Sequence, residues 1–518
     1  MRKTANYCSV IVIALILLCV SCNKNYSTPI DFTKTSEKVH IYPDYTNIVI
    51  PCNIAPLNFM VREKGDEFVI TMEGDENKTL VSGSGKDGII QFDIDEWHAF
   101  IQKNKGKSLR VTIYKKNDGK WYAFSPYNIQ VAEEPIDNYL SYRLIEPGYE
   151  IYRLLGLYQR NLTNFHVKTI IENPRLVYVK DKTYCVNCHN YQNYSTKRML
   201  FHARSQFGGT IIAENGKIEK LNTLSDSILG SAVYPSWHPT KNWLVFSSNK
   251  TGQVFHVKDH QKVEVLDHAS DIIFYNADTH EISNVVKTNT ELETFPVWSP
   301  KGDKIYYCVS KTNIQADTPD SIADSKIIEY REKLKYNIVS LPFDEKKMVF
   351  GDTPTLEFDA ESLDMSASVP RISPDGRYLL FTLGKYGQFH IWHTSSDLYV
   401  KDLQSGISYP LTAANSKNVD SYHSWSSNGR WIVFSSRRDD GSFTRSYITY
   451  FDKQGKAHKA FMLPQEDPTY NIRLFKSFNV PELTKDEVPY EAKQFDNVIR
   501  KQKAKTVTYK EIRTKYKK

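Results

Sequence analysis

The chain has 518 residues, of which 40% are hydrophobic and 25% charged, and its formal net charge is +7. This is the composition of a globular protein with a buried core, and the length allows two to four domains. Beyond the N-terminus no stretch reaches the roughly 18 apolar residues of a membrane-spanning helix, which excludes an integral membrane protein of that kind. The 33 tyrosines and 25 phenylalanines, set among short runs bounded by turns, favour strands over helices.

The first 21 residues have the pattern of a signal peptide. Two basic residues precede an apolar run over 10–20, which is too short to cross a hydrocarbon core of roughly 30 Å and ends at Ser21 and Cys22. The end of the run resembles a lipobox, which implies that Cys22 is lipidated and becomes the mature N-terminus. Cys19 is an alternative, because a leucine stands four residues before Cys22, where the lipobox has it three before. We therefore expect an exported lipoprotein, anchored by lipid in the outer membrane and facing the periplasm.

The region 25–134 differs in character from the rest of the chain. It contains alternating runs over 67–72, 88–93 and 109–114, separated by Gly, Asn and Lys turns. Alternation with a period of two indicates half-buried strands, so we predict a small antiparallel β-sandwich here. A connector over 135–184, partly helical around 149–162, is expected to join it to the following domain.

An internal repeat occupies most of the chain after residue 185. Four segments share a turn with Pro or Gly followed by an apolar strand, and their anchor residues are Trp237, Trp298, Ile372 and Trp425. The repeats resemble the WSPDG (PD40) repeat of TolB-like proteins, and the resemblance implies a β-propeller over 185–475. An altered copy is visible at 189–202, and strands near 169–179 or after 470 could close one more blade. The charged stretch 321–335 has helical spacing and indicates an insertion in one blade.

These patterns together predict an all-β protein, an N-terminal β-sandwich followed by a five- or six-bladed TolB-like β-propeller. The segment 476–518 is expected to be a basic C-terminal tail, solvated or in contact with the envelope surface, and not a nucleic-acid binder, since an exported protein rarely meets nucleic acid. The charged loop 437–441 is interpreted as a rim that faces water.

One motif indicates that the protein binds a cofactor. Of the four cysteines left after processing, Cys185 and Cys188 lie in the sequence Cys-Val-Asn-Cys-His, which ends at His189. In CxxCH the two thiols form thioethers with the haem vinyl groups and the imidazole binds the iron. We therefore predict one covalent haem c with His189 as the iron ligand. Two alternatives stay open, a disulfide between the two thiols and half of a zinc site, although no second CxxC completes the latter.

A sixth haem ligand is optional. Met199 and His202 follow the motif closely, but they are three apart on an expected strand and so point to opposite faces. Of the two, His202 is favoured and Met199 is the alternative, with His423 and His238 as more distant candidates. Each has an ordinary structural interpretation as a core or hydrogen-bonded residue.

Two functions are compatible with these features. The first is an envelope lipoprotein whose haem serves electron transfer or redox sensing, with the propeller as scaffold and docking surface. The second is a non-haem module that binds or assembles envelope proteins through the propeller face, as TolB does, with the cysteines only structural. No hydrolase signature is present, so enzymatic activity is not expected. The chain after the signal peptide also resembles a group of uncharacterised envelope proteins that combine such an N-terminal domain, these repeats and a CxxCH motif.

Overall fold

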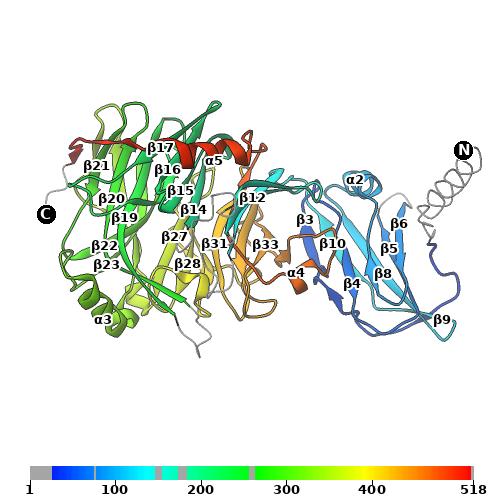
Figure 1. The fold of residues 1–518 in the computed structure, drawn as a ribbon. Coiled ribbons are helices and arrows are strands. Elements are labelled where there is room, and N and C mark those ends of the chain that lie inside the picture. The colour runs from blue at the N-terminus through cyan, green and yellow to red at the C-terminus, as the bar shows by residue number, and fades with distance from the viewer. Residues whose placement is uncertain (1–25, 75–77, 146–154, 173–183, 256–262, 515–518) are drawn as a thin grey trace, which may run out of the picture.

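The computed structural model describes residues 26–74, 78–145, 155–172, 184–255 and 263–514. Most of the regular structure in this part is small β-sheets, with the N-terminal sheets at one end and a β-propeller at the other (Figure 1). The expected signal peptide, 1–21, and Cys22 lie outside the described residues. Within these ranges, no helix combines the length and the apolar character that crossing a membrane requires.

The N-terminal region contains a seven-stranded sheet, a three-stranded sheet and one helix, α2 (Ile94–Lys103). The helix begins where the Asp93 carboxylate accepts bonds from the backbone of Asp95 and Glu96, and it buries Trp97. The larger sheet is mixed, because β1 pairs with β9 and β10 with β3 in parallel, whereas an antiparallel arrangement is expected from the sequence. The larger sheet comprises β1 (Thr33–Lys34), β3 (Ile48–Ile50), β5 (Glu67–Glu73), β6 (Thr79–Ser84), β8 (Ser108–Asn117), β9 (Lys120–Ala123) and β10 (Tyr127–Val131), and the smaller one β2 (Ile41–Tyr42), β4 (Phe59–Val61) and β7 (Ile89–Ile90).

The propeller is built of six sheets in the described part of the chain. Five follow one another in sequence: β14 (Tyr184–Gln192), β15 (Ser195–Ser205), β16 (Gly209–Glu214) and β17 (Lys217–Asn222); β18 (Ala232–Trp237), β19 (Trp243–Phe255), β20 (Val263–Asn276) and β21 (Glu281–Val286); β22 (Glu291–Trp298), β23 (Lys304–Lys311), β24 (Asn337–Asp344), β25 (Val349–Phe350) and β26 (Thr355–Phe358); β27 (Ser366–Ile372), β28 (Tyr378–Gly384), β29 (Asp397–Asp402) and β30 (Ser408–Pro410); β31 (Asp420–Trp425), β32 (Trp431–Ser436), β33 (Arg445–Tyr450) and β34 (Phe461–Met462). The third sheet carries α3 (Asp320–Tyr330) at the predicted insertion. Short helical turns are η4 (Arg331–Lys333), η5 (Glu361–Leu363), η6 (His390–Trp392) and α4 (Tyr470–Arg473).

The sixth sheet contains most of the segment that was predicted as a connector. Its strands are β11 (Tyr139–Ile145), β12 (Gly156–Asn161) and β13 (Val167–Glu172), and the fourth is β35 (Ser477–Thr484) from the far end of the chain. The helical interpretation around 149–162 is therefore wrong for 156–161, while 149–154 lie outside the described residues. Residues of β11 and β12 alternate between two buried faces, because this sheet packs between its neighbours, and that pattern is easily mistaken for a short helix.

The first strand of each propeller sheet, counted from the centre, contacts the first strand of the next sheet. These six inner strands are β14, β18, β22, β27, β31 and β35, and β35 contacts β14, so that the ring is closed. The repeat turns that follow the inner strands have the predicted geometry. In the copy at 373–376, Gly376 donates a backbone hydrogen bond to the Ser373 carbonyl over 2.8 Å and has a φ of +75°, which favours glycine.

The C-terminal segment is not a free tail. Helix α5 (Ala492–Lys501) buries Phe495 and Ile499 against the first propeller sheet and β13, and three short strands then pair in parallel with the outer edges of successive sheets. Figure 1 shows this segment, in red, crossing the outside of the propeller near β17 and β21. Three of the basic residues, Lys493, Arg500 and Lys501, belong to an amphipathic helix whose other face is apolar, and the rest follow it, so charge alone does not reveal that the segment packs on the propeller. The three pairs are β36 (Lys505–Thr506) with β17, β37 (Thr508–Tyr509) with β21 and β38 (Arg513–Thr514) with β25.

The N-terminal region and the propeller share a hydrophobic core. One cluster of buried side chains contains Trp97 and Ile129 from the N-terminal region together with Trp431 and Phe461 from the propeller. A buried polar contact accompanies it, since the Asn58 side chain of the N-terminal region donates to the Glu466 carbonyl of the propeller over 2.9 Å. The two parts are therefore held together by core packing, not by a linker.

Candidate functional site

Six residues of the inner strands adopt a left-handed backbone conformation at the same place in each strand. Their φ values lie between 47° and 53°, a conformation that is uncommon for residues other than glycine. Each stands at a shift in the strand register, a β-bulge that turns the chain toward the centre. All six line one central cavity of about 830 Å³, and we call them the inner ring: Cys188, Tyr234, Phe295, Val369, Tyr422 and Val480.

The motif CxxCH coincides with this ring. In four of the six inner strands the ring residue is followed by proline, namely at 235, 296, 370 and 481, whereas His189 and His423 take that position in the other two. Cys188 and His189 thus stand where the repeat has an aromatic or aliphatic residue and then proline. In the sequence, Tyr422-His423 and Cys188-His189 both have histidine where the other copies have proline. This shared departure from the repeat is the signal that could have placed both histidines at the cavity.

His189 is buried on the cavity wall and is 3% exposed. Burial lowers the pKa of its imidazole to about 3, and the nearby positive charge of Arg143 acts in the same direction, so the ring is neutral at pH 7. The Val480 backbone lies close enough to the ring to act against this pKa shift, although neither ring nitrogen makes a hydrogen bond of good geometry within the described residues. The Glu482 carboxylate is 3.9 Å from Nε2. A neutral imidazole with a buried, unpaired nitrogen has the chemistry of a metal ligand.

Cys188 has a free, half-buried thiol on the same wall. Cys185 pairs in register with Arg204 of β15, and its side chain lies outside the described part. Cys52 and Cys308 are free and buried, each in a different hydrophobic cluster, so neither forms a disulfide with the motif. The alternative of a disulfide therefore concerns Cys185 and Cys188 only.

The predicted sixth ligands do not line the cavity. His202 is buried between sheets, where its Nδ1 lies 2.9 Å from the Thr210 hydroxyl and its ring packs 6.0 Å from that of Phe246. Met199 is buried in a separate apolar cluster, so the two side chains do point to opposite faces, as expected. His238 accepts backbone hydrogen bonds from Thr240 and Lys241 and is also absent from the wall.

His423 is the candidate that does line the cavity, although its ring is engaged elsewhere. Its Nδ1 lies 3.4 Å from the Thr382 hydroxyl and its Nε2 lies 3.3 Å from the Leu380 carbonyl. Burial lowers the pKa of His423 to about 3, so it is neutral at pH 7. The cavity thus brings together Cys188, His189 and His423 and leaves out the residues favoured from the sequence.

Polar groups complete the wall. The Glu482 carboxylate accepts hydrogen bonds from the Asn190 side chain over 3.0 Å and from the Tyr191 backbone over 3.1 Å. Burial raises the pKa of Glu482 to about 8, so at pH 7 it is largely protonated. Elsewhere on the wall the rings of Tyr234 and Phe295 pack against each other, with centroids 4.1 Å apart. The wall is therefore mainly apolar and aromatic with a few convergent polar groups, which is the usual character of a ligand or cofactor site.

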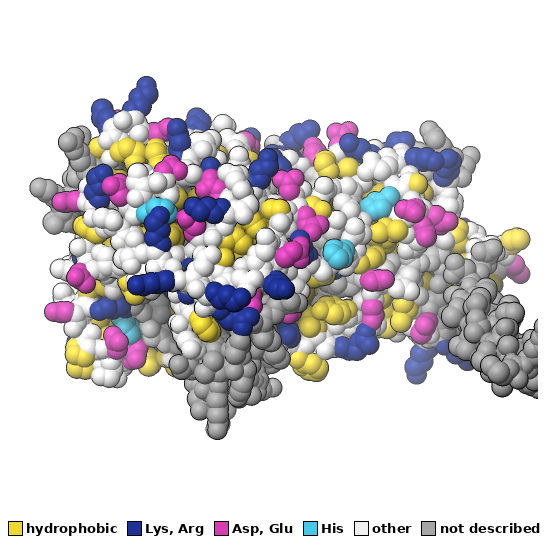
Figure 2. All heavy atoms as spheres, turned by 45° about the horizontal axis from the view of Figure 1, so that its top comes forward, with side chains coloured by type: hydrophobic (Ala, Val, Ile, Leu, Met, Phe, Trp, Pro, Cys, Tyr) yellow, Lys and Arg dark blue, Asp and Glu magenta, His cyan; other side chains and the backbone are white. Residues whose placement is uncertain are grey.

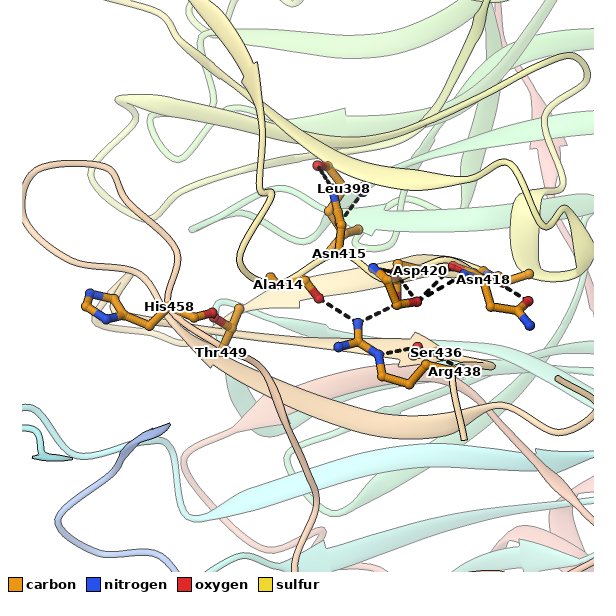
Figure 3. A network of polar contacts seen from close by, with 11 residues as sticks. Leu398, Ala414, Asn415, Asn418, Asp420, Ser436, Arg438, Thr449 and His458 are labelled. Carbon is orange, nitrogen blue, oxygen red and sulfur yellow. Dashed lines mark hydrogen bonds and ion pairs between the residues drawn. The ribbon is translucent and has the colours of Figure 1, made fainter. Parts of the chain in front are cut away.

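The charged loop 437–441 is not a water-facing rim throughout. Arg437 is only 1% exposed, and Arg438 donates to the Asp420 carboxylate over 2.7 Å and to the Ser436 hydroxyl over 2.8 Å. Figure 3 shows this network, in which Arg438 also reaches the Ala414 carbonyl. These contacts tie the loops of two neighbouring sheets together, so the loop has a structural role and is separate from the cavity.

Comparisons with known proteins give only weak similarities. No family model matches the chain, and no curated protein does. Among solved structures, a prolyl endopeptidase has a TM-score of 0.32 and 12% identity over 63% of this chain, which spans 42% of that enzyme. An oligogalacturonate lyase in complex with manganese has a TM-score of 0.25 and 10% identity, covering 78% of this chain and 99% of that one. An ancestral GH74 enzyme has a TM-score of 0.29 and 10% identity, over 64% and 39%. Similarities at this level carry no functional argument.

Among the described residues, no group of three or more His, Cys, Asp or Glu side chains is placed to hold a metal ion.

Proposed function

We propose that this protein is an envelope lipoprotein that carries one c-type haem in the central cavity of its propeller and acts in electron transfer or redox sensing. Cys185 and Cys188 attach the haem, and His189 binds its iron. Cys22 carries the lipid, which anchors the protein in the outer membrane with the propeller in the periplasm.

The observation that carries this proposal is the position and state of His189. Its imidazole is buried on the wall of an 830 Å³ cavity and is neutral, and within the described residues neither ring nitrogen makes a hydrogen bond of good geometry, although the Val480 backbone lies near. Such a group costs free energy unless a ligand satisfies it. The thiol of Cys188 lines the same cavity, and aromatic and aliphatic side chains surround it. The residues present therefore fit a haem.

The haem would supply a one-electron couple between ferric and ferrous iron. The protein's own residues set the conditions for it. The inner ring excludes water from the neighbourhood of His189, and the bulge at Cys188 turns the thiol and the following imidazole toward the same space. Burial, followed by the positive charge of Arg143 on the same wall, lowers the pKa of the imidazole and so keeps it available as a ligand.

We infer that the six sheets are six blades, the higher of the two numbers expected from the repeat. The propeller face then serves as a docking surface for envelope proteins. On the side of the molecule drawn in Figure 2, which is not identified with that face, lysine and arginine side chains are interspersed with acidic ones.

A non-haem module that binds envelope proteins is the second candidate, and one observation favours it. Cys188 occupies the same left-handed ring position as Tyr234 and Tyr422, so a thiol there is also explained by the repeat alone. In that case Cys188 is a small apolar member of the ring, and the cavity serves another ligand or none.

Haem staining separates the two. The full chain is expressed with a haem-attachment system and run on a denaturing gel beside the double variant Cys185→Ala/Cys188→Ala and the control Cys308→Ala, whose thiol is buried in another sheet. We expect a stained band for the wild type and the control, and none for the double variant. A colourless wild type, under conditions that mature a known cytochrome, would contradict the haem proposal.

A further inference from the structure

Three arginines converge on the central cavity from three different sheets. Arg143 comes from β11, Arg204 from β15 and Arg371 from β27, and all three line the same 830 Å³ space. The one acidic residue of the described wall is Glu482. Even when Glu482 is counted as ionised, the wall has an excess of two positive charges. The sequence separation of these arginines hides the cluster from any local pattern.

Most hydrogen-bond donors of these arginines have no partner within the described part of the protein. Arg371 donates to the Pro370 carbonyl over 2.9 Å, and Arg204 donates to the Ala232 carbonyl over 3.1 Å. Arg143 has a buried Nε without a hydrogen-bond partner. Since a guanidinium has five donors, the larger part of each fork remains available to a ligand in the cavity.

The three arginines are each half-buried, and a surplus of half-buried positive charge favours a counter-ion. An ionised side chain that is withdrawn from water without a partner destabilises the fold, and the cost falls when an anion pairs with it. The planar guanidinium fork can bind the two oxygens of a carboxylate in two parallel hydrogen bonds, as it can those of a phosphate. The surplus is at least two charges, and a ligand with two carboxylates balances two of them.

We propose that Arg143, Arg204 and Arg371 bind the two carboxylates of a ligand in the central cavity. The proposal deepens the function proposed above, since the two propionates of a haem are one source of this chemistry. A free dicarboxylate is the other source. The arginines are binding residues in both cases, and only the ligand that brings the carboxylates differs.

The first arm of the test uses haem-loaded protein. Single variants Arg143→Gln, Arg204→Gln and Arg371→Gln are compared with Arg110→Gln, an exposed arginine of the N-terminal sheet. A positive charge near the haem favours the ferrous state, so its removal lowers the midpoint potential. We expect each cavity variant to shift the potential downward in spectroelectrochemical titration and the control to leave it unchanged. Arg371→Met, which also removes the charge and keeps an unbranched side chain, serves if Arg371→Gln does not fold.

The second arm uses Cys185→Ala/Cys188→Ala protein, which attaches no haem, with glutarate as the probe and acetate as the monocarboxylate control. Binding is measured by titration calorimetry. Saturable glutarate binding that is at least tenfold tighter than acetate binding, and at least tenfold weaker in the cavity variants, supports the proposal with a free dicarboxylate as the source.

The two arms give distinguishable outcomes. A potential shift without glutarate binding supports the arginine site and identifies the haem propionates as its ligand. Glutarate binding in a protein that never stains for haem supports the arginine site while the haem function fails. The arginine site is contradicted if haem-stained protein shows no potential shift and glutarate does not bind. It is also contradicted if Arg110→Gln has the same effects as the cavity variants. In either case the staining experiment alone decides the haem function.

Discussion

The Nε2 atom of His189 lies 3.9 Å from Oε2 of Glu482, although the two residues stand on the first inner strand of the repeat and on the strand that closes the ring. The same carboxylate accepts hydrogen bonds from Asn190 and Tyr191. The CxxCH motif is thus held against the place where the two ends of the propeller meet. The site exists only when the ring is closed.

Replacement of His189 tests its role as a ligand. In haem-loaded protein, His189→Ala is expected to keep the covalently stained band, because the thioethers use the two cysteines, and to shift the Soret band of the absorption spectrum, because the iron loses an imidazole. His423→Ala is the matched control, since its ring nitrogens already contact Thr382 and Leu380. A Soret shift in the control and none in His189→Ala would assign the ligand to His423 instead.

Asp267 makes stability depend on pH. It is completely buried, and burial raises the pKa of its carboxyl from 3.8 to about 7, with a hydrogen bond from Asn249 acting against this. Between these two values the folded protein binds a proton that the unfolded chain has lost, so the free energy of unfolding falls as pH rises from 4 to 7 and stays low above 7.

Asp267→Asn, which mimics the protonated acid, should remove this loss. We expect wild type and variant to be similar at pH 4 and the variant to be more stable by about 2 kcal/mol at pH 8, roughly half of the ceiling set by three pKa units. Denaturant unfolding at the two pH values measures this. The exposed Asp95→Asn serves as control, and an Asp267→Asn variant that is less stable than wild type at pH 8 would contradict the prediction.

The Phe495 side chain packs the C-terminal helix against the propeller. Its ring is fully buried and lies 5.1 Å from Phe201 and 5.5 Å from Tyr490. Phe495→Ala is expected to lower the free energy of unfolding by about 3 to 5 kcal/mol, since truncation of a core phenylalanine leaves a cavity. Lys493→Ala, on the exposed face of the same helix, should change it by less than about 0.5 kcal/mol. Equal melting temperatures for the two variants would show that this segment is a loose tail after all.

Gly376 tests the backbone of the repeat turn. Its φ is +75°, and a Cβ built on it meets nothing within 4 Å, so Gly376→Ala adds backbone strain without a clash. We expect a loss of about 1 kcal/mol, and a smaller loss for Gly376→Asn, which tolerates this conformation better. Gly85 also has open space around its Cβ but no left-handed φ, so Gly85→Ala should be neutral or slightly stabilising. Equal free energies of unfolding for Gly376→Ala and Gly85→Ala would contradict the strain argument.

Local patterns in the sequence were sufficient for much of the fold. Four copies of one turn and strand predicted the propeller, because each copy specifies a local conformation, such as the turn at Gly376, that does not depend on distant residues. The CxxCH spacing likewise predicted its chemistry from the proximity of three side chains. The lipidation of Cys22, the haem and its function remain predictions.

Long-range pairing had to be seen in three dimensions. Strand β35 joins β11 in register, with Leu140 opposite Leu483, and no local signal links segments so far apart in the chain. For the same reason the basic segment after residue 476 was taken for a tail, and His202 was preferred to His423. The sequence determined which residue types each strand presents, and the closed ring alone decided which of them face the cavity, because closure brings side chains of six separate strands to one centre.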